Sequence, residues 1–144
     1  MRSLKFAFCF LALLSITILR LVSSEFVVVT VNPLFFNYVG VAWDANGDVY
    51  AIGNQVSGGV VVKSTDYGIT WTQIGTTSNF PSALYGIAAR RLSNGDFLIT
   101  VDDAGGIFTY SGTSWTQQDS IPGVLVGATI GLNGNAFVCG SVSY

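Results

Sequence analysis

Histidine is absent from this 144-residue sequence, and proline numbers only three residues. Imidazole is the commonest general base and zinc ligand in proteins, so its absence excludes Ser-His and Cys-His nucleophile systems and ordinary zinc sites. We therefore expect no metal and no cofactor. Charged residues make up 10% of the chain and hydrophobic residues 50%. This composition excludes a disordered protein, which requires low hydrophobicity and high charge.

Positive charge is scarce as well. The chain has six lysines and arginines against eight aspartates and glutamates, and three of the six basic residues lie within the first 24 positions. The remaining basic residues are Lys63, Arg90 and Arg91, so three positive charges stand against eight negative ones, a net charge of about −5. A surface of this kind releases few counterions from a phosphate backbone, which excludes nucleic acid as a partner.

The first 24 residues have the pattern of a secretory signal peptide. Arg2 and Lys5 precede an apolar run from 6 to 19, and small residues lead to Ser24, after which we expect cleavage. The run ends at Arg20 and is shorter than the roughly 18 to 20 residues that cross a bilayer. We predict a secreted, extracellular protein with no membrane span after cleavage. The alternative is an uncleaved signal that anchors the chain in the secretory pathway.

Cysteine is equally rare. Cys9 lies in the predicted signal peptide, which leaves Cys139 without a partner for an internal disulfide. Cys139 ends the apolar stretch 136–139. We therefore expect a buried small hydrophobic side chain and not a nucleophile.

The sequence is rich in glycine, with 17 residues, and it repeats internally. Three segments align, each with a glycine, an apolar stretch, an Asn-Gly pair and a second apolar stretch. The Asn-Gly pairs recur 48 and 39 residues apart, close to the length of a four-stranded propeller blade. Asn-Gly supplies the positive φ angles of a two-residue hairpin turn. The pairs are Asn46 and Gly47, Asn94 and Gly95, and Asn133 and Gly134.

The rest of each unit also reads as strands. Gly-Gly pairs at 58–59 and 105–106 precede apolar stretches, and alternating segments follow at 70–74 and 114–117. No segment after the signal shows a helical apolar period. We predict an all-β fold of about two and a half four-stranded antiparallel units over residues 25–144, with units at about 36–75, 84–118 and 125–144. Residues 25–31 add a uniformly apolar strand before the first unit.

One motif is sharp. Residues 64–71 read Ser-Thr-Asp-Tyr-Gly-Ile-Thr-Trp, between the third and fourth strands of the first unit. Asp66 can accept hydrogen bonds from backbone N–H groups of the following turn, and Gly68 permits a left-handed backbone. Ser64 can close the loop with a second bond, and Trp71 buries its ring beneath it. These residues predict a hairpin loop that holds itself together.

The pattern resembles the Asp-box, or BNR, repeat at every specified position, Thr70 included. Sialidases, sortilin-type ectodomains and photosystem II assembly-factor propellers belong to this family. The resemblance covers most of residues 26–144 and implies an incomplete β-propeller. In the second unit Gly112, Ser114 and Trp115 keep half of the motif, but Tyr110 stands where aspartate is required. The resemblance implies a structural role for the box, on the propeller face away from any active site.

Catalysis is not expected of the chain as it stands. The sialidase resemblance implies an arginine triad and a tyrosine with a glutamate partner. Arg90 and Arg91 are neighbours on a strand and point to opposite faces, so they cannot both clamp one carboxylate. The only glutamate after the signal is Glu25. Asp102 and Asp103 form an adjacent acidic pair, which we interpret as a solvated loop and not as a glycosidase dyad.

A structural or binding role remains, with a glycan or protein as ligand. The candidate binding residues are Tyr67, Phe80, Arg90 and Arg91, whereas Trp43 and Tyr85 lie in apolar strand stretches and are expected to pack within blades. Propellers have 4 to 8 blades, so we expect a fragment of a longer propeller; the alternatives are self-association of several copies through open blade edges and a compact β-sheet remnant. The alternative function is the N-terminal part of a sialidase-like or other glycoside hydrolase whose catalytic residues lie outside this chain.

Overall fold

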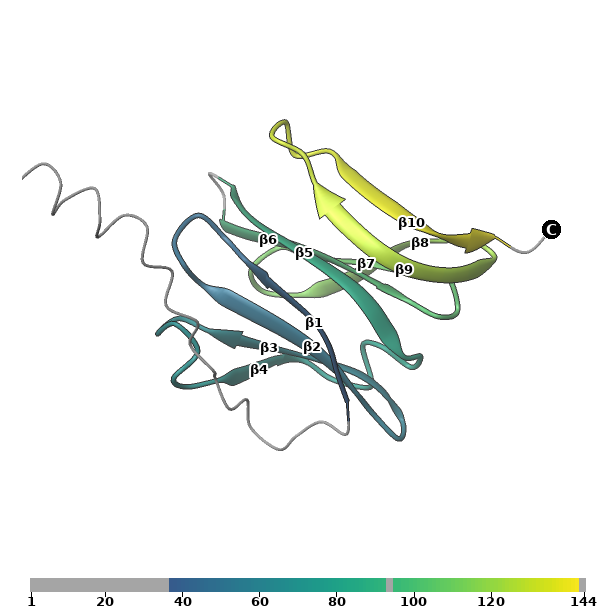
Figure 1. The fold of residues 1–144 in the computed structure, drawn as a ribbon, viewed down its shortest axis with the longest axis horizontal. Helices are drawn as coiled ribbons and strands as arrows, with labels where there is room; N and C mark the ends of the chain where they lie inside the picture. Colours follow the sequence, from purple (N-terminus) through teal and green to yellow (C-terminus); the bar gives the residue numbers. More distant parts are fainter. Residues whose placement is uncertain (1–36, 93–94, 143–144) are drawn as a thin grey trace, which may run out of the picture.

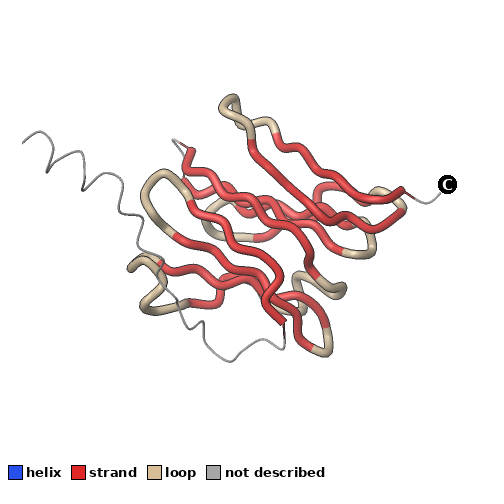
Figure 2. The backbone as a smooth tube through the Cα atoms, in the orientation of Figure 1, coloured by secondary structure: helices blue, strands red, loops and turns tan. Residues whose placement is uncertain are grey.

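The computed structural model describes residues 37–92 and 95–142, which form ten β-strands and, within these ranges, no helix (Figure 2). The strands are β1 (Asn37–Trp43), β2 (Val49–Gln55), β3 (Gly58–Ser64), β4 (Thr72–Gly75), β5 (Leu84–Leu92), β6 (Gly95–Asp102), β7 (Gly106–Tyr110), β8 (Trp115–Ser120), β9 (Gly123–Ile130) and β10 (Ala136–Val142). The predicted signal peptide, 1–24, and the apolar segment 25–31 lie outside the described residues.

The strands form three antiparallel sheets that follow the chain. The first sheet has the order β1-β2-β3-β4, the second has β5-β6-β7-β8, and the third pairs β9 with β10. The prediction of an all-β chain with four-stranded antiparallel units is confirmed. The described strands form no closed barrel. The expected units at 36–75, 84–118 and 125–144 correspond to sheets at 37–75, 84–120 and 123–142.

Successive sheets pack face to face. Strands β1 and β2 lie against β5, and β5 and β6 lie against β9, so that β1, β5 and β9 run side by side (Figure 1). The core between the first two sheets contains Ile52, Val61, Leu84 and Phe108, with the fully buried Phe80 ring edge-on to Phe108 at 5.1 Å between centroids. Burial of these side chains is the main force that holds the sheets together.

Phe80 was predicted to be an exposed binding residue, and that prediction is wrong. It lies in the loop between β4 and β5, where its amide and that of Asn79 donate to the Thr76 carbonyl. The loop turns the ring inward, because the apolar space between the two sheets stabilises it more than water does. The Phe80 carbonyl in turn accepts from the amide of Gly59. Phe80 therefore belongs to the core.

Asn54 adds a polar link between the first two sheets. Its side-chain amide donates to the Leu84 carbonyl at 3.0 Å, and its side-chain oxygen accepts from the Leu84 amide at 2.8 Å. One side chain on β2 thereby satisfies both backbone groups of the first residue of β5. This link fixes the position of the start of β5 relative to β2.

The Asn-Gly hairpins are longer than predicted. In the β1–β2 loop the Asp44 amide donates to the Asp48 carbonyl and the Gly47 amide to the Asp44 carbonyl, which closes a three-residue turn. Only the glycine has a positive φ, 85° at Gly47. This is a type I turn followed by a left-handed glycine, so the two-residue turn predicted at Asn46 and Gly47 is wrong.

The β9–β10 loop repeats this geometry. The Gly131 amide donates to the Asn135 carbonyl, the Gly134 amide donates to the Gly131 carbonyl, and Gly134 has a φ of 83°. Asn133 accepts from the Asn135 amide through its side chain. In the second unit Gly95 has a φ of 128°, and Asn94 lies outside the described residues.

Three further expectations about burial fail. Trp43 is 71% exposed and Tyr85 is 42% exposed, although both were expected to pack between strands. Cys139 is exposed as well, and not a buried small hydrophobe. Local apolar composition does not reveal which side chains a neighbouring sheet covers. Among the described residues, no helix is long and apolar enough to cross a membrane.

Candidate functional site

The loop from Ser64 to Trp71 joins β3 to β4 and is held by side-chain bonds to its own backbone. The Ser64 hydroxyl donates to the Asp66 carboxylate at 2.7 Å and accepts from the Gly68 amide at 2.8 Å. Asp66 accepts from the Thr70 amide at 2.8 Å and from the Thr70 hydroxyl at 2.6 Å. The predicted self-contained loop is therefore formed, with a contribution from the Thr70 hydroxyl that the sequence reading did not assign.

These bonds change the acidity of Asp66. The hydrogen bond from the Thr70 side chain, followed by the bonds from the Thr70 backbone and from Ser64, lowers the pKa of Asp66 from 3.8 to about 2. All of them stabilise the ionised carboxylate. Asp66 is half-buried, and burial acts to raise its pKa, so the lowering comes from the hydrogen bonds within the loop.

Trp71 closes the base of the loop. Its indole N–H donates to the Gly68 carbonyl at 2.9 Å, and its ring packs on the buried side chains Ala51, Val60 and Val62. Gly68 has a φ of 89°, in the left-handed region where glycine is favoured. The motif thus connects one tight turn to the apolar surface of its own sheet.

Tyr67, at the tip of the loop, is unusual in two respects. It is the only non-glycine residue with a positive φ among the described residues, at 60°, and its side chain is 75% exposed. A β-carbon added to Gly47 would lie 3.1 Å from the Tyr67 ring, so the ring rests against the β1–β2 loop. Ile69 is 81% exposed beside it in the chain. An exposed ring on a residue with this uncommon backbone conformation is a candidate for a binding surface.

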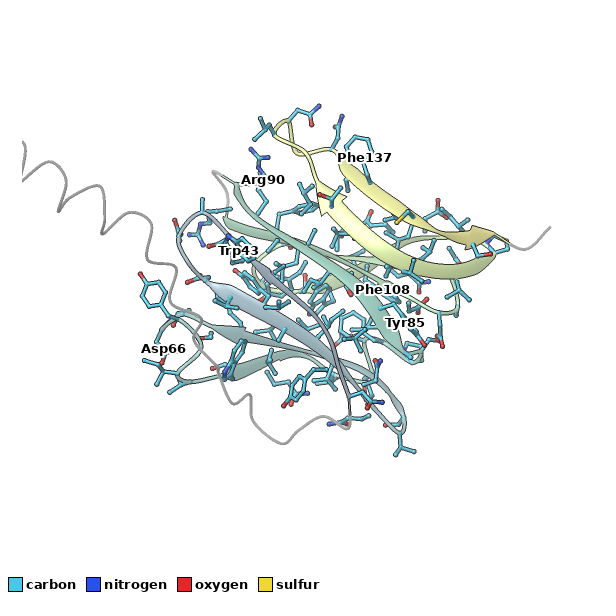
Figure 3. All side chains as sticks on the ribbon, viewed as in Figure 1. Trp43, Asp66, Tyr85, Arg90, Phe108 and Phe137 are labelled. Atoms are coloured by element: carbon cyan, nitrogen blue, oxygen red, sulfur yellow. The ribbon has the colours of Figure 1, made fainter. Side chains whose placement is uncertain are left out.

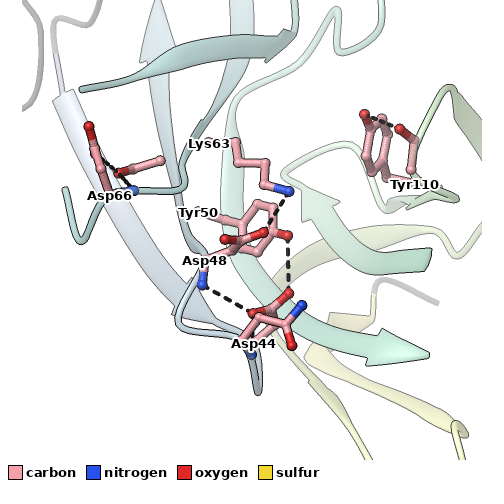
Figure 4. A network of polar contacts seen from close by, with 9 residues as sticks. Asp44, Asp48, Tyr50, Lys63, Asp66 and Tyr110 are labelled. Atoms are coloured by element: carbon pink, nitrogen blue, oxygen red, sulfur yellow. Dashed lines mark hydrogen bonds and ion pairs between the residues drawn. The ribbon is translucent and has the colours of Figure 1, made fainter. Parts of the chain in front are cut away.

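A polar network holds the β1–β2 loop to the adjacent strands (Figure 4). The buried Asp44 carboxylate accepts from the amides of Asn46 and Asp48 and from the Tyr50 hydroxyl. Lys63 forms an ion pair with Asp48 at 2.8 Å and lies over the Tyr50 ring, 5.4 Å from its centroid. These contacts fix the loop on which the Tyr67 ring rests.

Asp102 has the same kind of role in the second sheet. It was expected in a solvated loop, but its side chain is buried and accepts from the amides of Ala104 and Gly106. Asp103 is exposed, and its amide donates to the Ala83 carbonyl. The interpretation of Asp102 as a turn residue holds, whereas the expected solvation is wrong because its carboxylate satisfies two backbone groups inside the fold.

The equivalent loop of the second sheet is built differently. The Tyr110 hydroxyl donates to the Gly112 carbonyl at 2.8 Å, and Gly112 has a φ of 88°. Trp115 donates to the Ile74 carbonyl of β4 at 2.8 Å, so its indole reaches the first sheet and not its own loop. Ser114 takes part through its carbonyl, which accepts from the Ser111 amide.

The two predicted binding arginines lie far along the chain from Tyr67, on β5. Arg90 donates to the Gly131 carbonyl in the β9–β10 loop and thereby connects the second and third sheets (Figure 3). Arg91 is exposed on the opposite side of the strand. Tyr67 lies in the β3–β4 loop of the first sheet, whereas both arginines lie on β5 of the second.

Over the ranges that the structure describes, no group of three or more cysteine, aspartate or glutamate side chains is placed to hold a metal ion. Every buried side-chain nitrogen or oxygen there has a hydrogen-bond partner.

No protein-family model matches the sequence, and comparison with curated proteins found no significant relative. The candidate site is therefore the Tyr67 surface, which comprises Asn46, Gly47, Tyr67 and Ile69.

Proposed function

We propose that this protein is a secreted glycan-binding module built as part of an Asp-box β-propeller, with the three sheets as successive blades. The repeated strand order, the face-to-face packing of β1, β5 and β9 and the recurring hairpin geometry support the blade arrangement. The resemblance of residues 64–71 to the Asp-box supports the family.

The exposed Tyr67 ring carries the proposal for glycan binding. An aromatic face can stack on the apolar face of a sugar ring, and a rigid platform reduces the entropy lost on binding. The bonds within the Ser64–Trp71 loop and the Asp44 network supply that rigidity. The exposed Asn46 lies on the neighbouring loop, where an amide can donate to and accept from sugar hydroxyls.

The test is a glycan array probed with the secreted protein and with Tyr67→Asn. Asparagine tolerates a positive φ better than most residues, so this change removes the ring and keeps the loop. We expect the variant to bind the best glycan of the array about tenfold more weakly, the equivalent of about 1.4 kcal/mol, with an unchanged melting temperature. Tyr85→Asn, at an exposed tyrosine on β5, is the matched control and should retain binding.

Absence of binding to any glycan, or full binding by Tyr67→Asn, would contradict the proposal. Incubation of the bound glycan with the protein separates binding from hydrolysis. Release of free sugar would contradict a role in binding alone, since the glycosidase alternative places its catalytic residues outside this chain.

A further inference from the structure

The faces by which successive sheets pack can be compared through strand register. In the first sheet Gly40 pairs with Ile52 and Ala42 with Tyr50. Ile52 and Tyr50 are fully buried on the face that receives β5. A β-carbon added to Gly40 would lie 3.5 Å from the side chain of Ile87, so glycine allows the two first strands to approach closely.

The second sheet presents the same arrangement to the third. Gly86 pairs with Val101 and Ala88 with Ile99, and both partners are buried. A β-carbon on Gly86 would lie 2.9 Å from the Cα atom of Gly127, which is direct contact between β5 and β9. One packing arrangement therefore occurs twice in this chain, with the register of each sheet preserved.

In the third sheet the equivalent face is open. Gly127 pairs with Cys139 and Thr129 with Phe137, which are the positions that are buried in the first two sheets. Here Phe137 is 59% exposed and Cys139 is exposed too. These residues line an open apolar depression of about 250 Å³ (Phe137 is labelled in Figure 3). None of the ten described strands covers this receiving face in the way that β5 and β9 cover its two counterparts.

The complementary surface lies at the other end of the fold. Ile87 and Ala89 of β5 follow Gly86 by one and three positions and pack against the first sheet. In β1 the residues that follow Gly40 in the same way are Val41 and Trp43, and both are exposed, Val41 by 60%. The described residues therefore expose both halves of the interface that they form twice internally.

We propose that the receiving face of the third sheet, Phe137 and Cys139, binds the exposed side of β1, Val41 and Trp43, of a second copy of this chain. The occupant is another copy because the contact continues the packing that already joins β1 to β5 and β5 to β9. The association is head to tail, so it produces a ring if the rotation closes and a filament if it does not. It does not depend on glycan binding.

Sedimentation velocity of the secreted protein tests this association. The wild type should sediment as a multimer, whereas Trp43→Asp and Phe137→Asp should each be monomeric. A mixture of the two variants should form a one-to-one dimer, because each supplies the intact surface that the other lacks. Both side chains are exposed, so circular dichroism should show unchanged folding. Val56→Asp, in the exposed β2–β3 turn, introduces the same charge and should leave the multimer intact.

A wild type that stays monomeric at every soluble concentration would overturn the proposal. So would a monomeric Phe137→Asp beside a dimeric Trp43→Asp, since that result indicates two third sheets packed on each other. Cross-linking gives a second measurement. In a Cys9→Ser background, Val41→Cys should form disulfides with Cys139 of another copy under oxidised glutathione, and Val56→Cys should not.

Discussion

The β3–β4 loop and the β7–β8 loop occupy the same place in successive sheets. Each contains a glycine with nearly the same positive φ, and a tryptophan follows that glycine by three residues. In the first sheet Trp71 donates to Gly68 of its own loop, at 2.9 Å. In the second sheet Trp115 donates to the Ile74 carbonyl of the neighbouring sheet, at 2.8 Å. The same residue type at the same repeat position therefore closes a loop in one sheet and joins two sheets in the other.

The difference follows from what surrounds each tryptophan. In the first loop Asp66 and Ser64 satisfy the turn, and Trp71 turns toward the outer side of its own sheet. In the second loop no carboxylate is present, and the Trp115 ring packs edge-on to Phe80 at 4.8 Å between centroids and against Tyr110 at 5.0 Å. A repeat can thus lose the carboxylate hydrogen bonds of this loop when its tryptophan is held by long-range packing.

The largest expected effect is a difference in stability between the alanine variants of the two tryptophans. Trp115→Ala should lower the free energy of unfolding by about 3 kcal/mol, because it removes a ring packed between sheets and the bond to Ile74. Trp71→Ala should cost about 1 to 2 kcal/mol, since its contacts are confined to one sheet. Urea denaturation measures both. Equal losses would contradict the distinction between an inter-sheet and a local tryptophan.

Substitution of the left-handed glycine in each loop tests whether both loops require the same backbone conformation. Gly68 and Gly112 have φ values of 89° and 88°, and Gly68→Ala and Gly112→Ala should each cost about 1 to 2 kcal/mol, because a β-carbon disfavours the left-handed region. Thermal unfolding of the two variants provides the comparison. If only Gly68→Ala were destabilising, the second loop would have no strict backbone requirement.

A smaller effect concerns pH and should belong to the first loop alone. The pKa of Asp66 is lowered to about 2, so the stability that its carboxylate supplies is complete above about pH 4 and is lost as the pH falls through 2. The melting temperature of Asp66→Asn should therefore fall less than that of the wild type between these pH values. A parallel decline in both proteins would show that other groups control acid unfolding.

The smallest effect isolates the cause of that shift. Thr70→Val removes the hydroxyl that donates to Asp66 at 2.6 Å, so the pKa of Asp66 should rise toward 3.8. An NMR titration of the Asp66 carboxyl carbon measures the change directly. A pKa that stays near 2 in this variant would assign the shift to the backbone bond from Thr70 and to Ser64.

Much of the fold and one loop could be predicted from sequence. Period-two apolar stretches separated by glycine pairs were enough to place the strands, because strand formation depends on local alternation and turn residues. The Ser64–Trp71 loop could be predicted for the same reason, since all its bonds join residues within four positions. The positive φ of Tyr67 gave no signal of its own, although its position just before a left-handed glycine is a hint.

The sequence by itself determined the short-range chemistry of this protein, from the all-β character to the bonds around Asp66. Only the tertiary structure decided which side of each strand meets another sheet. It buried Phe80 and Asp102, exposed Trp43 and Cys139, and directed Trp115 to Ile74. The physical reason is that alternation tells which residues share a face, whereas the burial of that face depends on sheets that lie far away in the chain.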